Sequence, residues 1–68
     1  MWKQYLISKG LAYNEITGDF RKGLGWGRTL SVDMLMKGLF EIKVGEEVLF
    51  SDFVHSFSQF KTIIDKHI

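Results

Sequence analysis

The sequence contains neither cysteine nor proline. Without cysteine, the chain has no disulfide framework, iron–sulfur cluster or thiolate zinc site. Long apolar runs are also missing, since stretches such as 34–36 and 48–50 are far below the roughly 20 residues of a transmembrane helix. No secretory signal segment is recognisable near the N-terminus. We therefore expect a cytoplasmic protein with no membrane contact.

The composition is that of a folding chain. The 68 residues are 46% hydrophobic and 15% aromatic, which predicts one compact domain over residues 1–68. The formal net charge is only +1, too small for the broad phosphate attraction of a dedicated nucleic-acid binder. Bases nevertheless outnumber acids in residues 1–37, so a local basic face stays open as an alternative.

Apolar residues near the C-terminus recur at helical spacing. This stripe consists of Phe53, Phe57, Phe60, Ile64 and Ile68, with Val54 beside it. The spacing predicts an amphipathic helix over residues 51–68, capped by Ser51 or Asp52, with basic residues near its carbonyl end. We expect this helix to pack across one face of a sheet.

Alternating residues over 39–44 predict a half-buried strand, and Gly45 is suited to the turn before a further strand at 48–50. A second hairpin is predicted from the turn residues between 12–13 and 19–21. Residues 29–37 alternate as in a strand, although two helical turns are the alternative.

The N-terminal segment 2–9 suits a short helix that Gly10 ends, with Leu11 folding back; a strand over 2–8 is the competing interpretation. Together these elements predict an α+β fold. Its expected architecture is a three- or four-stranded antiparallel sheet with the C-terminal helix packed on one face.

The segment 21–28 is unusual because it combines three glycines, three bases and a tryptophan. Three interpretations follow: a structural connection whose tryptophan folds back onto the core, a protein-binding loop, and a nucleic-acid-binding loop. The candidate binding residues are Arg21, Lys22, Trp26 and Arg28, with Lys37 as a further base.

The sequence offers no convincing catalytic, cofactor or metal site. His55 and His67 are expected on one helix but too far apart to hold one ion, and no serine lies in a nucleophile motif. We therefore expect no enzyme activity and no cofactor.

Two segments resemble the amino-terminal portion of phage HNH-type homing endonucleases and their DNA-binding relatives: 13–20 (YNEITGDF) and 38–45 (GLFEIKVG). The sequence departs from that family, because its first turn lacks proline and Ser51 occupies the position of the first metal-site histidine. The resemblance suggests a phage or mobile-element origin but implies no nuclease activity.

The resulting hypothesis is a small interaction module that binds a protein partner. Nucleic-acid binding through segment 21–28 and a structural homodimer are the alternatives.

Overall fold

The computed structural model describes all 68 residues as two helices and one five-stranded sheet. The helices are α1 (Trp2–Ser8) and α2 (Phe57–His67). The strands are β1 (Ala12–Asn14), β2 (Asp19–Gly25), β3 (Arg28–Met36), β4 (Leu39–Val44) and β5 (Glu47–Phe53). The α+β class is therefore confirmed.

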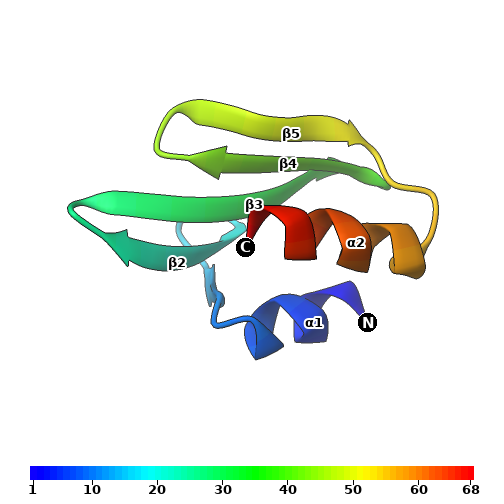
Figure 1. Cartoon of the computed structure of the whole chain (residues 1–68), viewed down its shortest axis with the longest axis horizontal. Coiled ribbons are helices and arrows are strands. Elements are labelled where there is room, and N and C mark those ends of the chain that lie inside the picture. The colour runs from blue at the N-terminus through cyan, green and yellow to red at the C-terminus, as the bar shows by residue number, and fades with distance from the viewer.

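The sheet is an antiparallel meander in which neighbouring strands follow chain order, β1 to β5. Both helices lie on the same side of it (Figure 1), and the opposite face carries no covering element. Neither helix has the length and apolar character that crossing a bilayer requires.

The core lies between the helices and the sheet. Its buried side chains are Leu6, Leu11, Phe20, Leu30, Val32, Phe40, Ile42, Phe60 and Ile64. Trp2 closes one side of this core, where its ring makes edge contacts with Phe20, Phe40 and Phe60 at 5.1–6.1 Å between centroids. Side chains alternate between the two faces along each strand, which places the core residues of β2, β3 and β4 on the helix side: Phe20, Leu30, Val32, Phe40 and Ile42.

The predicted end of the first helix is confirmed. The N–H of Gly10 donates to the carbonyl of Ile7 and that of Leu11 to the carbonyl of Leu6, at 3.0 and 3.1 Å. This is the Schellman pattern, and Gly10 takes its required positive φ of 93°. The segment 29–37 forms a strand as favoured, since β3 covers Arg28–Met36.

The sheet has five strands rather than the three or four that the sequence predicts. The segment 21–28 is not an irregular loop: β2 runs through Gly23 to Gly25 and β3 begins at Arg28. Glycine weakens a strand but does not prevent pairing, and here a register shift between Gly23 and Gly25 accommodates the segment.

The predicted C-terminal helix exists, but it begins later than expected. Phe53 belongs to β5, where it pairs with Leu39, and its side chain is 46% exposed instead of joining the helical stripe. The cap is Ser56, whose hydroxyl accepts from the Gln59 N–H at 3.0 Å, so neither Ser51 nor Asp52 caps the helix. Strand pairing with β4 outcompetes the helical periodicity of residues 51–55.

Candidate functional site

Trp26 occupies the tip of the β2–β3 hairpin and is 98% exposed. The hairpin closes at the pair Gly25 and Arg28, which leaves a two-residue turn of Trp26 and Gly27. Both turn residues have positive φ, 56° and 71°, as in a type I′ turn. The interpretation in which Trp26 folds back onto the core is therefore wrong.

The hairpin carries Trp26 away from the rest of the molecule. The last backbone contact of β3 on the β4 side is at Thr29, whose carbonyl accepts from the N–H of Gly45, the residue after β4, at 3.0 Å. Trp26 is three positions before Thr29, which at about 3.3 Å per residue places the turn at most about 10 Å further out. Figure 1 shows the β2–β3 turn reaching beyond the β4–β5 turn.

Side chains near this turn are few. A Cβ added to Gly23, Gly25 or Gly27 would meet no atom within 4 Å. The exposed side chains that remain are Leu24, Trp26 and Arg28, which we call the Trp26 tip. An indole with an aliphatic residue and a guanidinium beside it is the composition typical of binding hot spots.

The backbone at Trp26 is strained. It is the only residue other than glycine with positive φ, a region that costs an L-amino acid about 1 kcal/mol. Asparagine and glycine are favoured there, and an indole exposed to 98% regains nothing through burial. Folding stability therefore gives no reason for a tryptophan at this position.

The other predicted binding residues do not gather around Trp26. The Nε of Arg21 donates to Asp19 at 2.8 Å on the uncovered face of the sheet. The Nζ of Lys22 points to the helix side, where it donates to the carbonyl of Lys9 at 3.1 Å. Arg28 is the first residue of β3, which is nine residues long, and Lys37 comes directly after its last residue. Lys37 therefore lies about 30 Å from Arg28.

A second arrangement of polar residues lies on the uncovered face. It is a hollow of about 150 Å³ without any hydrophobic lining residue. The lining residues are Asp19, Arg21, Thr29, Ser31, Lys43 and Gly45, which we call the polar hollow. Register explains the grouping, because Ser31 is the Cα partner of both Arg21 and Lys43 on the adjacent strands.

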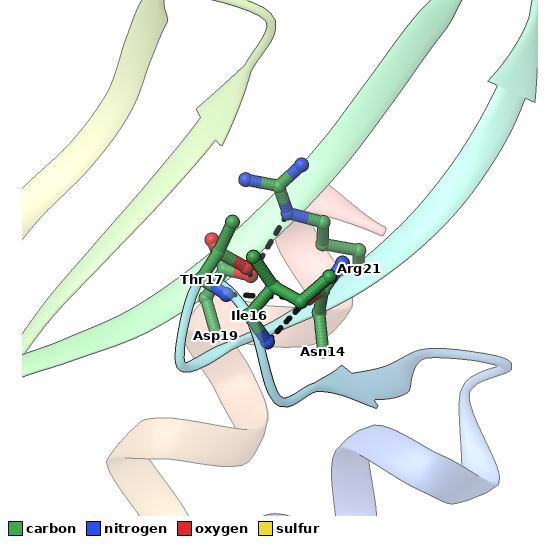
Figure 2. Close-up of polar contacts among 5 residues, drawn as sticks. All are labelled: Asn14, Ile16, Thr17, Asp19 and Arg21. Carbon is green, nitrogen blue, oxygen red and sulfur yellow. Dashed lines mark hydrogen bonds and ion pairs between the residues drawn. The ribbon is translucent and has the colours of Figure 1, made fainter.

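Asp19 fixes the position of Arg21 within this hollow. Burial tends to raise the pKa of Asp19, but hydrogen bonds from Arg21 and from the Thr17 hydroxyl outweigh it and hold this pKa below its ordinary value. The carboxylate is therefore ionised at neutral pH. Figure 2 shows the terminal nitrogens of Arg21 directed away from Asp19, so this part of the guanidinium is not used by the ion pair.

An apolar pocket of about 280 Å³ lies where the starts of both helices meet β4. Trp2, Phe40, Phe57 and Phe60 are among its lining residues. The polar groups beside it are used at the start of α2, since the Ser56 hydroxyl accepts from the Gln59 N–H and the His55 N–H donates to the Gln59 side chain.

Nowhere in the chain do three metal-ligating side chains lie close enough together to hold an ion.

Sequence inspection missed Thr29, Ser31 and Lys43 as a group. These residues are distant from Arg21 along the chain, and only the strand register brings them together. The alternation of β3 and β4 was recognisable, but the pairing of a given serine with a given lysine was not.

Comparisons with known proteins give no relative. No protein-family model, curated protein or solved structure matches the chain. The resemblance to phage HNH-type endonucleases thus gains no support from them.

Proposed function

We propose that this protein is a protein-binding module and that the Trp26 tip is its contact with the partner. The observation that carries the proposal is a tryptophan with positive φ and 98% exposure at the end of a projecting hairpin. A strained, solvated aromatic residue is unfavourable in the free protein, and insertion of the indole into an apolar pocket of a partner would recover its burial.

The geometry of the tip suits such insertion. A two-residue turn closed by strand pairing presents the indole in a defined position, so less conformational entropy is lost on binding than with a flexible loop. The lack of side chains at the flanking glycines leaves the ring accessible from several sides. Arg28 adds a donor for a carbonyl or carboxylate at the rim of the partner's pocket.

The distribution of charge supports a protein rather than a nucleic acid as the partner. Arg21 and Lys22 make contacts within the chain on opposite faces of the sheet. Only Arg28 remains next to Trp26, while Glu46 in the β4–β5 turn and Glu47 at the start of β5 lie at the same end of the sheet. A phosphate backbone would meet one base and two acids there, which is a poor electrostatic match.

Photo-cross-linking tests this proposal. A photoreactive phenylalanine analogue replaces Trp26 in one variant and Ile16 in another; Ile16 is 95% exposed, in the turn between β1 and β2 at the other end of the sheet. Irradiation in an extract of the source cell should give a discrete protein adduct from position 26 that position 16 does not give. Equal adducts from both positions, or adducts only with nucleic acid, would contradict the proposal. An adduct between two copies of the chain would identify the partner as a homodimer mate.

A further inference from the structure

We infer that the polar hollow binds a single oxyanionic group, such as a phosphate monoester or a carboxylate. The inference does not depend on the Trp26 tip, because it concerns a different face and different residues. Its basis is the convergence of unused hydrogen-bond donors from three adjacent strands on a hollow of about 150 Å³.

The shape of the hollow follows from residue size in one row of the sheet. Arg21, Ser31 and Lys43 lie side by side on β2, β3 and β4, with Ser31 in the middle. Strands are about 4.8 Å apart, so the two long basic side chains start about 10 Å from each other with a small residue between them. Thr29 and Gly45, which are also small, line the hollow in the next row of the sheet.

The donors of the hollow have few or no partners within the chain. The ammonium of Lys43 forms neither an ion pair nor a hydrogen bond, although its side chain is half-buried. The hydroxyls of Thr29 and Ser31 likewise make no hydrogen bond with another side chain or with the backbone, and Ser31 is only 8% exposed. An oxyanion placed between Arg21 and Lys43 would accept from these groups together.

The neighbouring charges restrict the ligand to a small one. Asp19 lines the hollow itself, and Asp33 and Glu41 face the same side one row further along β3 and β4. Two residues along a strand span about 7 Å, so an extended polyanion lying across the face would approach these carboxylates. A single anionic group held between the two bases stays away from Asp33 and Glu41, and the charge of Asp19 is offset by its ion pair with Arg21. This argues for one phosphate or carboxylate and against a nucleic-acid backbone.

Amide chemical shifts measured by NMR test the inference. Inorganic phosphate, O-phosphoserine and acetate are titrated separately into ¹⁵N-labelled protein at constant ionic strength. We expect saturable shifts confined to the amides around residues 29–31 and 43–45 with at least one of the three. The three titrations also distinguish free phosphate, a phosphorylated side chain and a carboxylate as the source of the group.

Two variants separate binding from general charge effects. Lys43→Gln removes a base that has no internal partner, so it should leave the fold intact and weaken binding about tenfold. Lys37→Gln removes an exposed base at the far end of β3 and should change nothing. Shifts spread evenly over the surface, equal weakening by both variants, or no saturation with any of the three anions would overturn the inference.

Discussion

The side chain of Lys22 on β2 reaches the end of α1, where its Nζ donates to the carbonyl of Lys9 at 3.1 Å. That carbonyl lies at the C-terminal cap of the helix, where a positive charge is favourable. Lys22 therefore attaches the first helix to the sheet. The sequence suggested that the positive charge of Lys22 binds a ligand, whereas in the structure this charge stabilises the end of α1.

Replacing Lys22 with methionine tests this role. The variant keeps an unbranched stem but loses the donor, so we expect the free energy of unfolding to fall by about 1 kcal/mol. Urea denaturation measures the change. Lys37→Met is the control, because Lys37 is exposed and makes no hydrogen bond or ion pair. An unchanged stability of the Lys22 variant would show that the contact contributes nothing.

The strain at Trp26 predicts that its removal stabilises the fold. Trp26→Asn places a residue that tolerates positive φ in the type I′ turn, and we expect a gain of about 1 kcal/mol in the free energy of unfolding. Trp2→Phe is the matched control, since Trp2 contacts three core rings and its truncation should destabilise. A loss of stability in the Trp26 variant would mean that the indole makes a stabilising contact.

Gly10 and Gly23 should respond differently to alanine. Gly10 has φ of 93°, and a Cβ there would lie 3.4 Å from the Lys22 side chain. We expect Gly10→Ala to cost about 1 kcal/mol or more, because alanine is strained in this region. Gly23 has no positive φ and open space around it, so Gly23→Ala should be nearly neutral. Equal thermal midpoints for the two variants would contradict the Schellman cap.

An ionic contact between the two helices makes stability depend on pH. A hydrogen bond from Tyr5 and then one from Lys9 lower the pKa of Asp65. The same contacts with Asp65 raise the pKa of Tyr5 and of Lys9. A lowered carboxyl pKa means stability that is present above about pH 4 and lost as the pH falls. Raised phenol and ammonium pKa values mean stability that is lost as the pH rises above about 10.

Asp65→Asn should therefore flatten both ends of the stability–pH profile. Chemical denaturation across the pH range measures it, with Glu15→Gln as the control, because Glu15 is exposed and forms no ion pair. If the Asp65 variant lost as much stability at acid and at alkaline pH as the native protein does, the contact between the helices would not be the source of these losses.

Local chemistry made much of the fold predictable. The end of α1 at Gly10 and the turn at Gly45 depend on backbone conformations that nearby residues dictate, and both were predicted. The start of α2 was not, because the pairing of Phe53 with Leu39 is a contact between distant residues that competes with local periodicity. The motif Ser56-Phe57-Ser58-Gln59 is a capping-box signature that would have placed the start of the helix.

The candidate sites were less predictable than the fold. The sequence indicated that Trp26 was unusual, but its exposure depends on how far β2 and β3 extend past β4, which the strand register sets. The polar hollow depends on the same register. Sequence reasoning grouped Trp26 and Arg28 with three further bases that the strands place elsewhere on the sheet, namely Arg21, Lys22 and Lys37.

The most direct test of the account compares the affinity of the cross-linked partner for the native protein and for Trp26→Asn. Calorimetric titration should show a loss of affinity of about 30-fold or more, the effect of removing a hot-spot residue worth about 2 kcal/mol. This loss should occur in a variant that is at least as stable as the native protein. Equal affinity of the two proteins for the partner would contradict the claim that Trp26 is the binding residue.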